Sequence, residues 1–153
     1  MSLIRAIENQ YFEIDRQYSI KEFDARTNGQ PIRENYWKRK RELNTHAYFL
    51  FVFTRLEDHI KNESTGLIID MRNTILNWKP RAIWDNTDED NLHFKKRLGL
   101  LTEKNQPVYA KIVDYYRHRN TIAHGGTIPG IGTAINMIDV FADVKSYLSI
   151  LTR

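Results

Sequence analysis

Apolar residues recur every three or four positions along most of the chain. In residues 2–26 the recurring positions include Ile4, Ile7 and Tyr11. This spacing is typical of an amphipathic helix with one face turned towards a core. Residues 28–31 (NGQP) then combine glycine and proline, which break a helical pattern and favour a turn. The sequence therefore predicts a first helix over 2–26, followed by a tight connection.

The longest predicted helix covers residues 33–62. Its second half, residues 45–60 (THAYFLFVFTRLEDHI), is apolar almost all round. A helix of this kind is expected to lie centrally and to contact neighbours on several sides. Residues 65–66 (TG) are expected to interrupt it, and a further helical face over 67–78 is expected to end before Pro80.

The second half of the chain also shows the spacing of apolar residues that is typical of helices. Residues 79–91 are rich in Asp and Asn and are expected to form a loop, followed by a short helix over 92–101. A further helix is expected to begin near Pro107, and a last one to cover 133–151. No stretch alternates as a strand requires. We expect an all-α protein, a bundle of four main helices plus one or two short helices, in a single domain over 1–153.

Composition narrows the classes of function. The chain has 153 residues, no cysteine and a formal net charge of +4. Disulfides, thiol catalysis and thiolate metal sites are therefore excluded. The longest apolar run, residues 47–53, is far too short to cross a bilayer, and no secretion signal is visible. We expect a cytoplasmic protein without membrane contact.

One stretch carries residues that a structural helix does not need, namely RNTIAHGG at residues 119–126. Asn120 and His124 are four positions apart and share a helix face, Arg119 lies at the edge of that face, and Tyr116 extends it by one turn. Arginine can bind two oxygens of one phosphate at once, and histidine transfers protons near neutral pH. Asparagine can orient a hydroxyl or an imidazole. This combination suits a phosphodiester substrate.

A purely structural interpretation of the same residues is available. Arg119 would be a surface residue, Asn120 a polar residue near a helix end, and His124 a residue favoured by the helix dipole. For a lone histidine this interpretation is preferred. For the complete RNxxxH pattern, chance occurrence in a chain of this size is roughly one in a hundred. We therefore favour the functional interpretation.

The pattern formed by Arg119, Asn120 and His124 resembles the RNxxxH motif of the HEPN superfamily. Members of this family are small helical bundles, and many of them are metal-independent ribonucleases. The resemblance implies a HEPN-like bundle, a homodimer with a composite active site, RNA as substrate, and no cofactor or metal. Some members carry, two residues after the histidine, a tyrosine that an antitoxin modifies. Gly126 occupies that position here, which argues against inhibition by that route.

The implied reaction is attack of the ribose 2′-OH on the adjacent phosphorus, leaving a 2′,3′-cyclic phosphate. His124 would transfer protons, Arg119 would stabilise the developing charge, and Asn120 would position the 2′-OH or the imidazole. Glu57 or Asp58 could support the site, as an acidic residue of the long helix does in the family. His118, beside Arg119, is a weaker candidate for a role. A basic run is expected to bind the RNA backbone: Lys38, Arg39, Lys40 and Arg41.

Three functions from different classes remain open. The first is an endoribonuclease acting as a toxin or anti-phage effector, with a possible antitoxin protein as partner. The second is a catalytically silent HEPN module that binds nucleotide, RNA or a protein. The third is an unrelated helical interaction protein. The histidines show neither HExxH nor an i, i+4 pair, so no metal site is expected. Trp37, Trp78 and Trp84 are expected to be core or interface anchors rather than base-stacking platforms.

Overall fold

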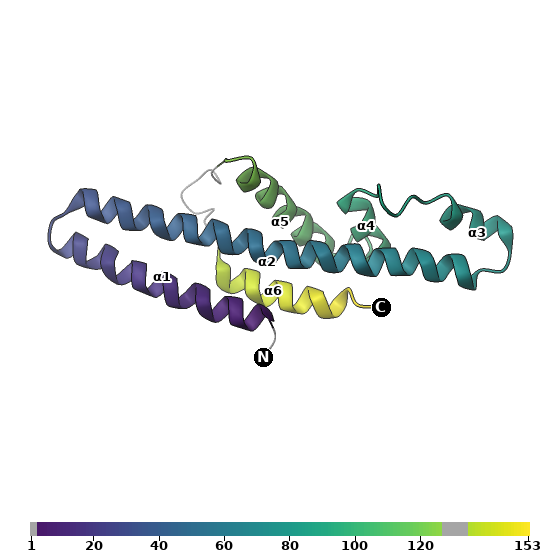
Figure 1. Ribbon diagram of the computed structural model, residues 1–153, viewed down its shortest axis with the longest axis horizontal. Coiled ribbons are helices and arrows are strands. Elements are labelled where there is room, and N and C mark those ends of the chain that lie inside the picture. The colour runs from purple at the N-terminus through teal and green to yellow at the C-terminus, as the bar shows by residue number, and fades with distance from the viewer. Residues whose placement is uncertain (1–2, 127–134) are drawn as a thin grey trace. The chain divides into compact units, whose positions relative to one another are not determined.

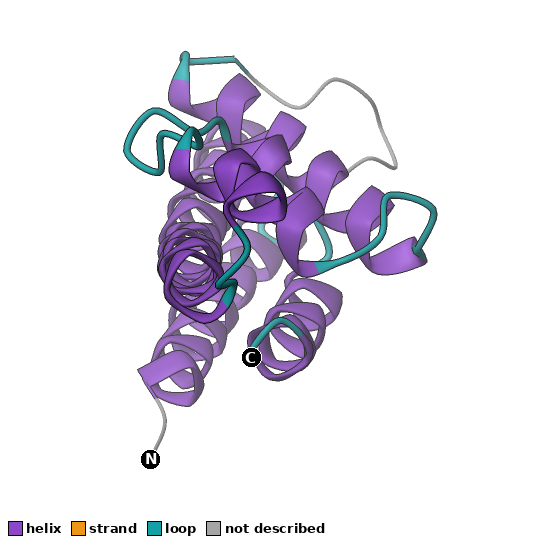
Figure 2. Ribbon diagram, turned by 90° about the vertical axis from the view of Figure 1, so that its right-hand side faces the viewer, coloured by secondary structure: helices purple, strands orange, loops and turns teal. Residues whose placement is uncertain are grey.

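A computed structural model describes residues 3–126 and 135–153. These residues form helices and connecting loops, and no strand occurs among them (Figures 1 and 2). The predicted all-α class is thereby confirmed for this part of the chain. The helices are α1 (Leu3–Thr27), α2 (Pro31–Thr74), α3 (Trp78–Asp85), α4 (Phe94–Leu101), α5 (Pro107–Ala123) and α6 (Met137–Ile150). The predicted start of the last helix, at residue 133, lies outside the described residues.

The described residues pack as two compact units. The first contains the chain up to Val52 together with residues from Arg119 to Lys145. The second contains Phe53–His118 and Ser146–Arg153. The single domain predicted over 1–153 stays a prediction. No helix in the described part of the chain is long and apolar enough to cross a membrane.

In the first unit, α1 and the first half of α2 run side by side in opposite directions (Figure 1). The turn between them depends on Gly29, whose φ of 62° lies in the left-handed region that glycine readily adopts. Pro31 then begins α2, at a position where a missing N–H does no harm. Tyr11 joins α1 to the other elements. Its hydroxyl lies 3.1 Å from Thr45 Oγ1, and its ring centroid lies 5.9 Å from that of Phe141 on α6.

In the second unit, the core is formed by the second half of α2 with α4 and α5. Phe53 and Leu98 are fully buried, and the Phe94 ring lies 5.9 Å from the Phe53 ring. Residues 45–60 were expected to be covered on several sides. Within this stretch Phe49 and Phe53 are fully buried, whereas Phe51, in the first unit, keeps 47% of its surface exposed.

Two arginines of the second unit hold the segment between α3 and α4. The guanidinium of Arg97, only 5% exposed, donates to the carbonyls of Glu89 and Leu92 and to the hydroxyls of Ser64 and Thr65. Arg72 donates to the carbonyls of Trp84 and Thr87 and forms an ion pair with Glu89 at 2.6 Å. These bonds replace the backbone hydrogen bonds that an irregular segment lacks.

The predicted interruption at residues 65–66 is wrong, because α2 continues from Pro31 to Thr74. A glycine in a helix costs only about 1 kcal/mol relative to alanine, which tertiary contacts readily offset. At Gly66 the absent side chain leaves room for the guanidinium of Arg153. That guanidinium also pairs with Glu63 at 3.3 Å and Asp70 at 2.7 Å.

The boundaries predicted around residue 78 are also wrong. The helix expected to run to Trp78 ends at Thr74, and Trp78 begins α3 inside the expected loop. The side chain of Asn77 caps α3 by accepting the N–H of Lys79 at 3.1 Å. Pro80 lies in the first turn of α3, where proline is tolerated. Trp78 is 66% exposed, so it is not a core residue of this unit.

Candidate active site at the end of the fifth helix

The two glycines after His124 end α5 in a defined way. The N–H of Gly126 donates to the carbonyl of Thr121 at 2.9 Å, and the N–H of Gly125 donates to the carbonyl of Ile122 at 3.0 Å. These two bonds form a Schellman motif, and Gly125 has the left-handed φ, 76°, that the motif requires. The pair of glycines therefore has a structural cause. His124 is the last residue before the chain leaves the helix.

Gly126 is held close to the helix it follows. A Cβ atom at this position would lie 2.8 Å from the carbonyl oxygen of Thr121 and 2.9 Å from its Cγ2. The contact with the backbone oxygen cannot be relieved by rotating a side chain. The local conformation thus disfavours any larger residue here, including a tyrosine two positions after the histidine.

The three residues of the motif lie in the first unit, where Arg119 and Asn120 belong to the last turns of α5 and His124 directly follows its last residue, Ala123. Arg119 Nη1 donates to Asn120 Oδ1 at 3.1 Å, and both side chains are half-buried. His124 is exposed, and its backbone N–H donates to the carbonyl of Asn120 at 3.1 Å. The helix end thus presents a held guanidinium, a carboxamide whose amino group can still donate, and an accessible imidazole.

The weaker candidates Tyr116, His118 and Glu57 belong to the second unit. The ring of Tyr116 stacks on that of Phe94, with centroids 4.3 Å apart and planes 13° from parallel. His118 Nε2 lies 3.9 Å from a carboxylate oxygen of Asp114. Glu57 is half-buried on α2. The contacts of Tyr116 give it a packing role, and a role for any of the three in a site stays a prediction.

The basic run predicted to bind RNA lies on α2 in the first unit, and its members differ. Lys38 and Arg39 are exposed. The ammonium of Lys40 lies 5.5 Å from the centroid of the Tyr36 ring. Arg41 instead forms ion pairs within the unit, at 3.0 Å to Asp15. The hydrogen bond to Asp15 raises the pKa of Arg41.

Arg41 also pairs with Glu22, at 3.0 Å, and its side chain lines a small hollow of about 200 Å³ beside Glu22 and Arg26. Glu22 is 8% exposed and receives a second guanidinium, that of Arg26, at 3.2 Å. Two guanidinium groups and the carboxylate of Glu22 therefore meet at this hollow. Arg41 connects α1 to α2, whereas Lys38 and Arg39 form no ion pair with any described carboxylate.

The sequence interpretation gave no role to Tyr36, and it assigned Trp37 to the core or an interface. Tyr36 is 52% exposed, and Trp37 is half-buried. Both residues directly precede the basic run, in the order YWKRKR. That adjacency was the available signal, since aromatic and cationic side chains together bind nucleic acid. No group of three His, Asp or Glu side chains in the described part of the chain is placed to hold a metal ion.

Comparisons of the chain with models of known protein families, with curated proteins and with solved structures find no match.

Proposed function

We propose that the protein is an endoribonuclease of the HEPN type that cleaves RNA without a metal ion. The observation that supports this most is the complete Arg119, Asn120 and His124 set at one helix end, where the guanidinium is bonded to the carboxamide and the imidazole is exposed. The all-helical architecture is compatible with it. We also propose that it acts in the cytoplasm.

The reaction follows from the chemistry of these three side chains. A base removes the proton of the ribose 2′-OH, and the 2′ oxygen attacks the adjacent phosphorus. The bond from phosphorus to the 5′ oxygen breaks, and an acid protonates that leaving oxygen. The products are a 2′,3′-cyclic phosphate and a 5′-OH. Requiring the 2′-OH restricts the substrate to RNA.

Each residue has a separate task in this scheme. His124, exposed at the helix end, transfers the proton as base or acid, a contribution of about 10²–10⁴-fold in rate. Arg119 stabilises the additional negative charge on the phosphorane. Asn120 accepts a hydrogen bond from Arg119, and its amino group can orient the substrate hydroxyl or the imidazole. A second copy of the chain, paired so that two such helix ends face each other, would supply the remaining acid or base.

The test is cleavage of labelled single-stranded and structured RNA in excess EDTA, with analysis of the new ends. We expect 2′,3′-cyclic phosphate ends, and we expect His124→Ala to lower the rate by about 10²–10⁴-fold. Arg119→Ala should abolish cleavage as well. The matched control is His93→Ala, because His93 is exposed and its side chain makes no capping hydrogen bond.

Equal rates for His124→Ala and the parent protein would reject the assignment of His124. Cleavage that stops on addition of EDTA would reject the metal-independent reaction. The oligomeric state, measured by light scattering, tests the homodimer. A toxin or anti-phage role predicts that expression of the parent protein, but not of His124→Ala, arrests cell growth, and an antitoxin protein would relieve that arrest.

A catalytically silent module is the second candidate, and one observation favours it. Arg119 is half-buried, and its guanidinium is already bonded to its neighbour Asn120, so two of the three motif residues hold each other in place. Such a pair can hold a nucleotide, an RNA or a protein partner without chemistry. Binding of RNA with no new ends after long incubation would support this candidate over the nuclease.

A further inference from the structure

The aromatic residues ahead of the basic run form a cluster between α1 and α2. The rings of Tyr36 and Trp37 meet edge to face, with centroids 4.9 Å apart and planes at 77°. Tyr18 on α1 lies 5.7 Å from the Trp37 ring. Tyr36 has about half of its surface in solvent, so part of its side chain is open to a ligand.

Cations lie against these rings and beside them. The ammonium of Lys21 lies 4.5 Å from the centroid of the Trp37 ring, and that of Lys40 lies 5.5 Å from the Tyr36 ring. Lys38 and Arg39 are exposed, and no described carboxylate forms an ion pair with either. On the helix, Tyr36, Arg39 and Lys40 share one face, because residues three and four apart are neighbours.

We propose that Tyr36 and Trp37, with Lys21, Lys38, Arg39 and Lys40, form a platform that binds single-stranded RNA. Bases stack on the aromatic faces, and the cations bind the phosphates. The lysines now lie over these rings, so a base reaches a ring face only when the ammonium moves from the ring to a phosphate. The choice of RNA as ligand rests on the proposed function, and the platform is separate from the Arg119, Asn120 and His124 site.

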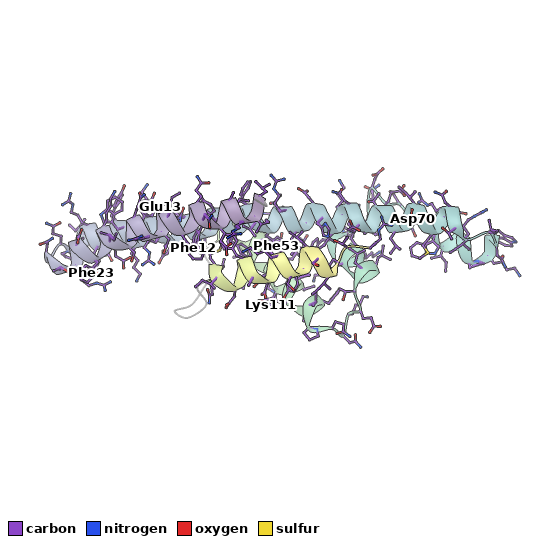
Figure 3. The ribbon with its side chains drawn as sticks, turned by 90° about the horizontal axis from the view of Figure 1, so that it is seen from below. Phe12, Glu13, Phe23, Phe53, Asp70 and Lys111 are labelled. Carbon is purple, nitrogen blue, oxygen red and sulfur yellow. The ribbon has the colours of Figure 1, made fainter. Side chains whose placement is uncertain are left out.

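The same observations distinguish a single strand from a duplex. The bases of a duplex are stacked on each other and offer no free face to a tyrosine. A site that used only the cations would bind both forms according to their phosphate charge. The platform therefore predicts a preference for single-stranded RNA that depends on the rings, together with a salt dependence that depends on the cations. Phe23 is 64% exposed and lies near the C-terminal end of α1, close to the turn that leads into α2 (Figure 3). It adds an apolar surface there.

The test measures fluorescence anisotropy of a fluorescein-labelled oligouridine, with the His124→Ala variant as parent so that no cleavage interferes. Tyr36→Leu should weaken binding by about five- to 150-fold, the loss of one stacked base. Tyr36→Phe keeps the ring and should bind like the parent. Arg39→Gln should reduce the slope of log affinity against log salt by about 0.7, as expected for one phosphate contact on a single strand.

The matched control is Lys96→Gln, because Lys96 is an exposed cation on α4, away from these residues in the chain. It should change neither the affinity nor the slope. Far-UV circular dichroism of each variant checks the fold. If Tyr36→Leu fails to fold, Arg39→Gln still tests the platform through its salt slope.

Unchanged binding by a folded Tyr36→Leu, or equal affinity for a duplex of the same length, would overturn the platform. Tighter binding to vesicles of phosphatidylserine than to oligouridine would overturn it in favour of a membrane surface. Failure of the nuclease proposal looks different. In that case the protein with His124 intact does not cleave RNA, while oligouridine still binds and remains sensitive to Tyr36→Leu.

Discussion

The two units use their arginines and lysines in different ways. In the second unit, Arg97 is 5% exposed and donates its N–H groups to carbonyls and hydroxyls, and Arg72 donates to carbonyls of the same segment. In the first unit, Lys38 and Arg39 remain in solvent. Arg41, two positions after Arg39, instead forms ion pairs with Asp15 and Glu22. Arg26 of the same unit also pairs with Glu22.

This difference shows that a count of positive charges does not locate a binding surface. A buried guanidinium bonded to the backbone stabilises one segment and is not available to a ligand. An exposed cation beside an exposed ring contributes little to stability and can exchange water for a phosphate. The comparison can be tested by removing charge from each unit in turn.

The largest effect is expected for Arg97→Met. Methionine fills a similar volume but leaves the carbonyls of Glu89 and Leu92 without their donor. Hydrogen bonds from charged groups are worth about 1.5–3 kcal/mol each, and the buried charge offsets part of their sum. We expect the free energy of unfolding to fall by about 2–4 kcal/mol, measured by urea denaturation followed by circular dichroism.

The matched control in the first unit is Lys38→Gln, which should change the free energy of unfolding by less than about 0.5 kcal/mol. Equal stability of Arg97→Met and the parent would contradict the comparison. It would mean that burying the charge of Arg97 costs as much as its hydrogen bonds contribute.

A smaller effect is expected from acid. In the second unit, a hydrogen bond from Arg72 lowers the pKa of Glu89, and one from the backbone N–H of Arg153 lowers the pKa of Glu63. Because the pKa is lower in the folded state, each carboxylate stabilises the fold above its ordinary pKa of about 4.3. That contribution is lost as pH falls through the folded value. The urea midpoint should therefore fall with pH below about 4.5, less steeply in Arg72→Gln. If Arg72→Gln leaves the pH dependence of the urea midpoint unchanged, the ion pair of Glu89 does not contribute to it.

The smallest effect concerns the glycine inside α2. Gly66→Ala gains about 1 kcal/mol of helix propensity but displaces the guanidinium of Arg153 from Glu63 and Asp70. Exposed ion pairs are worth about 0–1 kcal/mol each, so losing these two offsets the gain and the net change should lie within about 1 kcal/mol of zero. In an Arg153→Ala background the same substitution should stabilise by about 1 kcal/mol, measured by thermal unfolding. A lower free energy of unfolding for Gly66→Ala in that background would show that position 66 does not tolerate even a methyl side chain.

Much of the helical pattern could be predicted because it depends on local spacing. The first helix and the start of α5 were placed within one residue, since glycine and proline act on their own neighbours. The interruption at residues 65–66 and the loop over 79–91 were wrong for a different reason. Contacts from Arg153 and the cap by Asn77 decide those positions, and neither is visible in a local window.

For the candidate site, the sequence by itself determined which chemistry is present, namely a guanidinium, a carboxamide and an imidazole within six residues, and a basic run after two aromatic residues. It could not separate Arg41 from Lys38 and Arg39, because four adjacent cations look alike in a charge pattern. Only the tertiary structure decided that Arg41 is bonded to α1 while Tyr36 is exposed. The physical reason is that burial and ion pairing are set by side chains distant in sequence, whereas helix periodicity is set by neighbours.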